Sequence, residues 1–489
     1  MVPEGDHANP GSDLRVKLES HLPASLPPDS STAVFCFGHC FHRHRRVAGI
    51  ELLVDSVAVR PAAARMPRRD LFEWIAGTAE DPEGRSYRSG FWATVPLHAS
   101  AGATSVELEA QVWLEGGASV RAPLGTVSIR EPERYPGELP PVSAETIAIC
   151  MATYEPEPAL LGPQLESLRA QTYQRWVCLI SDGGSSPRRF ARLLELTGDD
   201  ERFVVWRSED RLGPYRNFER ALRMVPGEAE LVALCDQDDR WDADKLAVLR
   251  SALGSAQLVY CDQRRVTERG DVLRDSMWTA RRNDWRNLAS LLVANTVPGA
   301  TALFRRGLLS LALPFPDAPG VPYHDHWLAL VALAAGELRY VDRPLQDWVQ
   351  HEAAVSGGAE RSRAPAGSRG WRGAYFGGFE MRDVFARTLL LRCGSRLRAR
   401  RRRALEWFVA SARSPVAFAW LALRPLRRFV GRDETLGGEF ALARGVLWRW
   451  LIELAALRAE RPGSRAYDAS FPDPPQFEQR RLRRWRAAA

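Results

Sequence analysis

Lysine is nearly absent from this chain of 489 residues: Lys17 and Lys245 are the only two, against 65 arginines. A GC-rich genome explains such a bias, because arginine codons are rich in G and C and lysine codons are not. A functional explanation stays open, since the guanidinium group suits the recognition of phosphates and carboxylates. Hydrophobic residues make up 45% and charged residues 26% of the chain, which excludes a disordered or fibrous protein.

Cysteine is scarce, and a secretory signal is missing. The seven cysteines are an odd number, and the N-terminus has no basic start followed by an apolar core. We therefore expect reduced thiols in a cytoplasmic protein. Five potential zinc ligands nevertheless follow the strand-like run AVFCF within nine residues: Cys36, His39, Cys40, His42 and His44. Their spacing fits no common zinc module, so a metal site there is an alternative to ordinary strand residues.

Long hydrophobic runs are also missing. The longest uncharged stretch is NLASLLVANTVPGATALF, from Asn287 to Phe304, and Pro298 and Gly299 interrupt it. This pattern predicts a helix, a loop and a strand, and no membrane-spanning helix is expected.

Positive charge is concentrated near the C-terminus. Residues 391–489 contain 22 arginines and nine acidic residues, a net charge of +13, so the preceding residues carry −6 of the total of +7. The pattern of the basic region predicts helices in which arginines flank Trp, Phe and Leu. This composition is typical of helices at an anionic membrane surface. A helical bundle packed against the rest of the chain is the alternative. Nucleic-acid binding is not expected, because no recognition motif is present.

The N-terminal part predicts β structure. Residues 1–30 are polar and proline-rich, which favours a disordered leader. Residues 31–130 contain short β-type runs, and in VELEAQVWL the residues Val106, Leu108 and Val112 alternate onto one face. We predict an antiparallel β-sandwich here, followed by a proline-rich linker over 131–145.

Strand and helix patterns alternate from residue 146 to about 360. The runs TIAICMA, WVCLISD, RFVVWRS, ELVALCD and QLVYCD read as buried strands separated by amphipathic helices. Such βαβ units predict a parallel sheet of an α/β fold with functional residues at the carboxyl ends of its strands. Residues 361–489 form the basic helical region described above.

Polar residues follow three of these strands. Thr153 and Glu155 follow the first, Asp182 begins an Asp-Gly-Gly-Ser turn after the second, and the fourth ends in Asp236, Asp238 and Asp239. The first two sites also fit a turn with a helix cap. Three carboxylates in four residues repel one another, so a cation or ligand donors must offset that cost.

Eight blocks follow one another over residues 146–358: ICMATYEPEP, LRAQTY, CLISDGGSS, RLGPYRNFERAL, ALCDQDDRWDADKL, NTVPGATALF, PYHDHWLALVALAAGELRYVD and VQHEAAVSG. In this order they resemble the motifs of bacterial family 2 glycosyltransferases with the Rossmann-like GT-A fold, especially the rhamnosyltransferase-like branch. Two departures stand out: the family usually has Asp-Asp-Gly-Ser at Asp182 and often Asn at Glu155.

The resemblance implies roles for individual residues. Thr153, Glu155, Asp182 and Asp236 would hold the nucleotide and ribose of a nucleotide-sugar donor, and Asp238 would bind Mg2+ or Mn2+. His351 matches a position that contacts the metal or the diphosphate, and Asp325 matches the catalytic base. Asp325 also suits an N-cap of the helix that follows, and both roles are compatible.

Other candidates come from side-chain chemistry alone. Arg211 and Arg216 either reach the donor phosphates or lie on the surface, and Trp327 and Trp348 either stack on a sugar or pack in the core.

The resemblance implies an inverting, metal-dependent glycosyltransferase. Its donor would be a dTDP- or UDP-sugar, with rhamnose among the candidates, and its acceptor a glycan or a lipid-linked glycan in surface polysaccharide synthesis. The expected location is the cytoplasm, peripheral to the inner face of the cell membrane. The alternative is a catalytically inactive carbohydrate-binding protein with a transferase-like domain.

Overall fold

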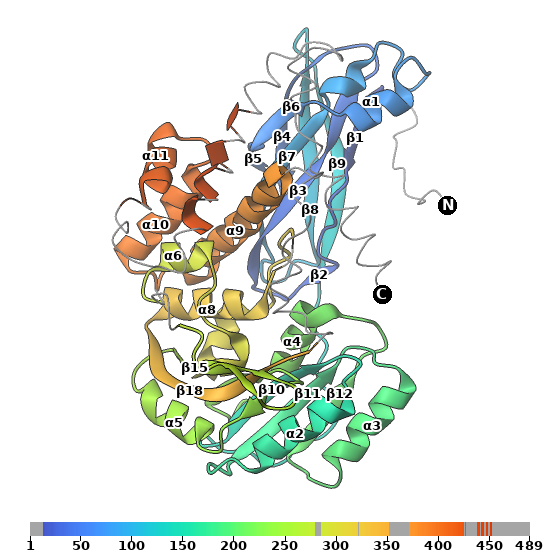
Figure 1. The fold of residues 1–489 in the computed structure, drawn as a ribbon. Helices are drawn as coiled ribbons and strands as arrows, with labels where there is room; N and C mark the ends of the chain where they lie inside the picture. The colour runs from blue at the N-terminus through green and yellow to red at the C-terminus, as the bar shows by residue number, and fades with distance from the viewer. Residues whose placement is uncertain are drawn as a thin grey trace.

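The computed structural model describes residues 13–278, 285–320, 322–351 and 371–424, followed by 426, 438–440, 442–444, 446–447 and 450–451. Figure 1 shows an N-terminal β layer at the top, a central α/β layer at the bottom, and helices α9, α10 and α11 beside the β layer above α8. This architecture confirms the expected fold class: a central α/β sheet, N-terminal antiparallel sheets and C-terminal helices.

Two sheets face each other in the N-terminal layer. The first has the order β1 (Leu14–Leu18), β3 (Ser31–His42), β7 (Gly90–His98) and β6 (Ala63–Met66). The second has the order β2 (Ser25–Leu26), β9 (Ser119–Ile129), β8 (Ser105–Leu114), β4 (Val47–Val54) and β5 (Val57–Val59). The pairings are antiparallel except β2 with β9. Helices α1 (Arg69–Ile75) and η1 (Arg85–Arg88) join β6 to β7.

The alternation predicted in β8 is present. Val106, Leu108 and Val112 are buried against residues of the opposite sheet such as Val34 and Ala93. The expectation of a disordered leader is wrong for residues 14–18, because β1 pairs antiparallel with β3. An edge strand of this kind depends on a partner distant in sequence, so local composition does not reveal it.

The cysteines and the histidine His39 of the predicted cluster lie on opposite faces of β3, because side chains alternate between the two faces of a strand. Cys36 and Cys40 point into the sandwich core, where burial raises the pKa of each thiol to about 12. His39 lies on the opposite face, with Nδ1 2.6 Å from Glu19 Oε1. Within the described residues, no group of three or more His, Cys, Asp or Glu side chains is arranged to hold a metal ion.

The central sheet is mixed. Its order is β12 (Phe203–Arg207), β11 (Trp176–Asp182), β10 (Ile147–Thr153), β13 (Leu231–Cys235), β17 (Ala302–Arg305), β15 (Leu258–Thr267), β18 (Leu338–Gln350) and β14 (Arg240–Trp241), with β16 (Val272–Arg274) paired to β15. Strands β10 to β13 are parallel as expected. Strand β17 runs antiparallel between β13 and β15, so the prediction of a wholly parallel sheet is wrong at this point.

Helices cover both faces of this sheet. Ile147, Ile149 and Met151 of β10 pack toward α2 (Pro158–Arg169), α3 (Pro187–Thr197) and α5 (Lys245–Leu253). Ala148 and Cys150 face the core shared with α4 (Gly213–Arg223) and α8 (His324–Ala335). The same core takes in α6 (Leu288–Val293) and α7 (Leu309–Ala312), with η2 (Gly299–Thr301) and η3 (Arg306–Leu308) beside them. The Asn287–Phe304 stretch is thus helix, loop and strand, as predicted.

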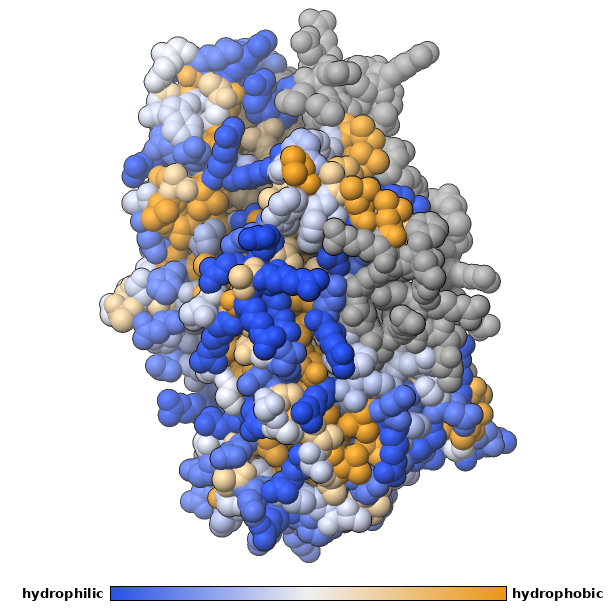
Figure 2. All heavy atoms as spheres, turned by 90° about the vertical axis from the view of Figure 1, so that its left-hand side faces the viewer, coloured by the Kyte–Doolittle hydropathy of each residue, from blue (hydrophilic) through white to orange (hydrophobic). Residues whose placement is uncertain are grey.

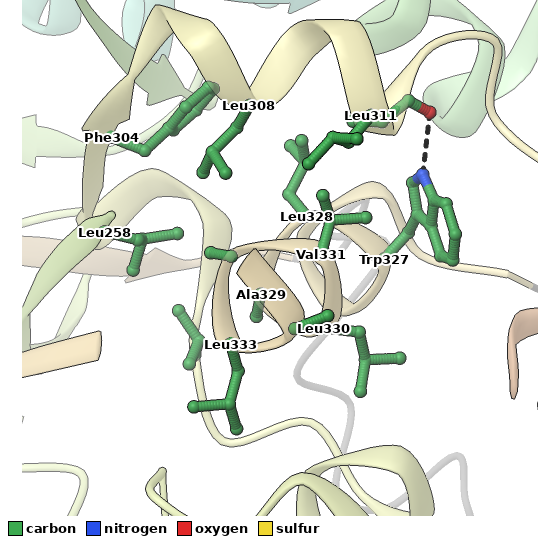
Figure 3. Packing of buried hydrophobic residues seen from close by; sticks show 14 of the residues in the cluster. Leu258, Phe304, Leu308, Leu311, Trp327, Leu328, Ala329, Leu330, Val331 and Leu333 are labelled. Atoms are coloured by element: carbon green, nitrogen blue, oxygen red, sulfur yellow. Dashed lines mark hydrogen bonds between the residues drawn. The ribbon is translucent and has the colours of Figure 1, made fainter. Parts of the chain in front are cut away.

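Helix α8 is apolar on all sides and buried on all sides, as a helix at the centre of a core must be. In Figure 3, Leu328, Leu330 and Val331 point in different directions from it, while Phe304 and Leu308 approach from neighbouring segments. Trp327 is fully buried and its Nε1 donates to the carbonyl of Ala312 at 2.9 Å. Trp327 therefore packs in the core and cannot stack on a sugar.

The C-terminal helices are α9 (Trp371–Cys393), α10 (Ala399–Ala410) and α11 (Pro415–Leu423). Phe385, Leu405 and Leu421 are buried in the core that also contains α8, so the helices pack on the α/β layer. Val384 of α9 meets Phe35 and Phe37 of the sandwich. In the part of the chain that the structure describes, no helix is long and apolar enough to cross a membrane.

Candidate functional site

Three parallel strands bring the predicted site residues to one edge of the sheet. Thr153 at the end of β10 is paired with Asp182 at the end of β11, and Met151 is paired with Cys235 at the end of β13. Asp236 follows Cys235 directly. The carboxyl ends of adjacent parallel strands are the usual position for a ligand in an open α/β sheet.

Asp182 is fully buried and its carboxylate is held by neighbours. Oδ2 accepts hydrogen bonds from Thr153 Oγ1 at 3.1 Å and Ser185 Oγ at 2.5 Å, and Oδ1 accepts from the amide of Ser185 at 3.0 Å. Asn217 of α4 donates from Nδ2 to the carbonyl of Thr153 at 2.9 Å. These contacts fix the two strand ends relative to each other.

The glycines after Asp182 have a steric cause. A Cβ at Gly183 would lie 3.0 Å from Asn217 Nδ2, and one at Gly184, which has a φ of +86°, would lie 2.9 Å from the carbonyl oxygen of Asp210. The close approach of Asn217 therefore leaves little room for a side chain at Gly183.

Glu155 caps the helix that follows the second strand. It has a φ of +45°, its amide donates to Ser185 Oγ at 2.8 Å, and its carboxylate accepts from the amide and hydroxyl of Ser186. Ser186 immediately precedes α3, so these bonds satisfy donors at the start of that helix. The structure thus places Glu155 at the predicted strand end with its oxygens already bonded.

Tyr154 and Arg211 form an exposed flat surface beside these groups. The guanidinium of Arg211 lies 4.5 Å from the ring centroid of Tyr154, and the ring is 38% exposed. The backbone of Tyr154 is paired with the side chain of Gln237, which accepts from the amide at 3.0 Å and donates to the carbonyl at 3.3 Å. Sequence reasoning missed Tyr154, although an aromatic residue directly after a strand end was an available signal.

Arg216 does not extend toward this surface. Its guanidinium is paired with Glu219 and Asp317, and it donates to the carbonyl of Phe315 at 2.9 Å. Arg216 therefore joins α4 to the chain before α8.

The acidic residues after β13 perturb one another. Burial, together with the charges of Asp238 and Asp325, raises the pKa of Asp236 to about 7. Burial, together with the charges of Asp236 and Asp238, raises the pKa of Asp239 well above its usual range. Asp239 Oδ2 accepts from Gln346 Nε2 at 3.1 Å, while its buried Oδ1 has no hydrogen-bond partner. Such an arrangement favours binding of a cation.

A buried lysine lies beside these carboxylates. Lys245 Nζ donates to Gln346 Oε1 and to the carbonyl of Ala300, both at 2.6 Å, and lies 3.5 Å from the ring centroid of Trp241. Gln346 therefore connects Lys245 to Asp239. Burial lowers the pKa of Lys245 to about 8. Sequence reasoning missed Lys245 and Gln346. Lys245 could have been noticed, because it is one of only two lysines in the chain and lies three residues after Asp242.

Asp238 and His351 are in direct contact. His351 Nε2 lies 2.8 Å from Asp238 Oδ2, and this hydrogen bond raises the pKa of the imidazole. The remaining residues of the VQHEAAVSG block, 352–357, lie outside the described residues.

These groups fit a divalent cation that takes its other ligands from a bound diphosphate. Mg2+ in nucleotide sites is held by one or two carboxylates together with phosphate oxygens and water. Asp238 and His351 could supply two donors to such an ion; among the described residues no third His, Cys, Asp or Glu joins them in a metal-holding group, so phosphate oxygens and water would have to complete the set.

Asp325 lies in the first turn of α8. Its Oδ2 accepts from the amide of Gly299 at 3.1 Å and its Oδ1 from the amide of His326 at 2.6 Å. Burial raises the pKa of Asp325 to about 6 despite these bonds. Its charge is also one of the causes of the raised pKa of Asp236.

The histidines on either side of Asp325 belong to the core. His324 stacks on Phe218 with ring centroids 3.6 Å apart, and His326 Nε2 lies 2.7 Å from the carbonyl of Leu291. Burial lowers the pKa of each to about 3, so both imidazoles are neutral. They anchor the start of α8 and hold Asp325 in place.

The fold is α/β, and the candidate site lies at the carboxyl ends of its parallel strands, where ligands bind in open α/β sheets. Residues 148–311 match the family described as Glycosyl transferase family 2.

A relative is an uncharacterized protein, y4gI, of Sinorhizobium fredii (strain NBRC 101917 / NGR234). It is 30% identical over 128 residues, which are 25% of this chain and 14% of the relative. The match therefore spans only a small part of that protein's length.

Solved structures with similar folds include S. aureus TarS 1–349 in complex with UDP-GlcNAc, with 14% identity and a TM-score of 0.42. The similarity covers 65% of this chain and 93% of that one. The mannosyltransferase PcManGT from Pyrobaculum calidifontis, in complex with GDP-Man and Mn2+, has 19% identity and a TM-score of 0.34. That similarity covers 65% of this chain and 90% of that one.

Proposed function

We propose that the protein is an inverting glycosyltransferase that moves a sugar from a nucleotide diphosphate to an acceptor hydroxyl. The observation that carries this proposal is the contact between Asp238 and His351 beside the strand ends, together with the carboxylate of Asp325, which the amide of Gly299 holds at the start of α8. Asp238 and His351 suit a diphosphate and its cation. Asp325 suits an acceptor hydroxyl that must lose a proton.

The chain's own residues divide the work. Asp325 accepts the proton of the acceptor hydroxyl, and the amide of Gly299 orients its carboxylate. Thr153, Asp182 and Asp236 hold the nucleotide. Arg211, which lies over the ring of Tyr154, faces the nucleotide from the exposed side of the site. Asp238 and His351 would hold Mg2+ or Mn2+, which neutralises charge on the departing diphosphate.

The finer assignments are part of this proposal. The donor is a dTDP- or UDP-sugar, with rhamnose as one candidate sugar, and the acceptor is a glycan or a lipid-linked glycan of a surface polysaccharide. The enzyme works in the cytoplasm, peripheral to the anionic inner face of the membrane, which it contacts through its C-terminal region.

The test is hydrolysis or transfer with a panel of UDP-, dTDP- and GDP-sugars, with added Mn2+ or Mg2+ and with EDTA. We expect turnover of at least one donor that EDTA and Asp238→Ala abolish and that Asp325→Asn reduces by about 10² to 10⁴. Binding of donors without turnover of any would instead identify a carbohydrate-binding protein that has lost catalysis.

A further inference from the structure

Helix α11 carries an apolar stripe on its exposed side, formed by Val416, Ala419, Leu423 and, just beyond the helix, Leu426. Their spacing of three, four and three residues places them on one face. Val416, Leu423 and Leu426 are 67%, 56% and 54% exposed, whereas Ala417 and Leu421 on the opposite side are buried. The helix therefore uses one face for the core and presents a second apolar face outward.

A neighbouring segment repeats this pattern. Phe440, Leu447 and Leu451 are large apolar residues exposed at a spacing of seven and four. The segment lies beside α11, because the rings of Phe418 and Trp450 are 6.2 Å apart. A second segment in contact with α11 thus also exposes large apolar side chains.

Arginines adjoin the stripe. Arg400 and Arg403 are exposed on α10 and lie on the same side of that helix as Trp407, which makes an edge contact with Trp420 of α11 at 5.9 Å. The segment from Gly394 to Arg424, both included, contains eight arginines and one acidic residue, Glu406. Figure 2 views the side of the molecule on which α10 and α11 lie, and shows hydrophilic side chains at its centre with hydrophobic patches above them.

We infer that this face docks on an anionic membrane surface, with the apolar stripe entering the interface and Arg400 and Arg403 facing lipid phosphates. Exposed aliphatic residues, partly buried tryptophans and arginines together match the requirements of an interfacial helix. A second copy of the chain fits this face less well, because the arginine rows would approach each other. Nucleic acid would leave the aliphatic stripe in water. The inference rests on the proposed function and deepens one part of it, the membrane contact of the C-terminal region; with the proposed catalysis it shares only the expectation that a lipid-linked acceptor lies in the same membrane.

The test is sedimentation of the full-length protein with vesicles of phosphatidylcholine alone and of phosphatidylcholine mixed with phosphatidylglycerol. We expect binding to the anionic vesicles only, weakened by salt. The triple variant Val416→Ser, Leu423→Ser, Leu426→Ser should bind at least about tenfold more weakly, since three apolar groups no longer enter the interface. The double variant Arg400→Gln, Arg403→Gln should lose about tenfold or more in affinity and part of the salt dependence.

Matched controls are Val57→Ser, an equally exposed valine on the sandwich, and Arg188→Gln with Arg192→Gln on α3. Both should sediment as the unchanged protein does. Unaltered vesicle binding by the triple variant would overturn the inference, as would equal binding to neutral vesicles. A dimer that the triple variant converts to a monomer, or retention of RNA that it abolishes, would assign the face to another partner and overturn it as well. The vesicle assay contains no sugar donor, so its failure leaves the proposed catalysis unaffected.

Discussion

Asp238 Oδ2 and His351 Nε2 lie 2.8 Å apart although the two residues are 113 positions apart in the chain. Asp238 follows β13 and His351 follows β18, so the contact spans the part of the central sheet that contains β17 and β15. Because the imidazole and the carboxylate are already together, a cation that binds a diphosphate here finds two protein groups in place.

The first prediction concerns this pair. Asp238→Ala should abolish turnover, and His351→Gln should raise the Mn2+ concentration for half-maximal activity about 10- to 100-fold, in the range seen when groups around a metal are changed. Titration of activity with Mn2+ measures the shift. His98→Gln, a histidine of the sandwich, is the control. An unchanged metal requirement in His351→Gln would exclude a role for this imidazole at the cation.

The second prediction is a pH dependence set by Asp325. Burial raises its pKa to about 6, and only the ionised carboxylate accepts a proton, so kcat should fall about tenfold per pH unit below pH 6 and be level above it. Asp325→Asn should lose about 10² to 10⁴ in kcat, together with this acidic limb, while donor binding is retained. A variant that keeps the same pH profile would show that another group is the base.

The third prediction uses the two lysines. Lys245→Met removes the buried ammonium beside Asp236 and Asp239 and should lower the free energy of unfolding by about 3 to 5 kcal/mol. Lys17→Met, on the exposed side of β1, should change it by less than about 0.5 kcal/mol. Urea unfolding followed by circular dichroism measures both.

A partial rescue distinguishes charge from packing at this position. If the loss comes from uncompensated carboxylates, Asp239→Asn should recover part of the stability in the Lys245→Met background. No recovery would indicate that the lysine acts through its bonds to Ala300 and Gln346 alone.

The fourth prediction concerns the close approach of Gly299 to α8. A Cβ there would lie 2.8 Å from His324 Nε2 and 3.0 Å from Asp325 Cβ, so Gly299→Ala should shift the carboxylate and lower kcat by about 10²-fold with a smaller effect on stability. Gly307→Ala is the matched control, because its Cβ would meet nothing within 4 Å. Steady-state kinetics of both variants test the expectation, and equal rates would contradict it.

The parts of the site that directly follow a buried strand were predictable from the sequence. The strand ends at Thr153, Asp182 and Asp236 followed from buried runs and parallel connections, since such strands end at one edge. The position of β17 was not predictable, because an antiparallel strand inserted between β13 and β15 leaves no mark on its own four residues.

Contacts between distant residues were beyond sequence reasoning for the same reason. Lys245, Gln346 and Asp239 meet only because α5, β18 and the turn after β13 converge, and each residue alone reads as a surface residue. Glu155 was assigned from its position in a motif. Its bonds to Ser186 depend on the left-handed backbone conformation of Glu155 itself, which the sequence does not predict.

Helix α9 also determines when the protein can finish folding. Its Thr388 Oγ1 accepts from the amide of Ala33 at 3.0 Å, and its Val384 covers Phe35 and Phe37 of the sandwich. Residues at the two ends of the chain therefore complete one another. During synthesis the N-terminal sheet emerges first, and Phe35 and Phe37 stay uncovered by α9 until about 350 further residues have been translated. Hydrophobic surface exposed during this interval makes the nascent chain prone to aggregation until α9 docks.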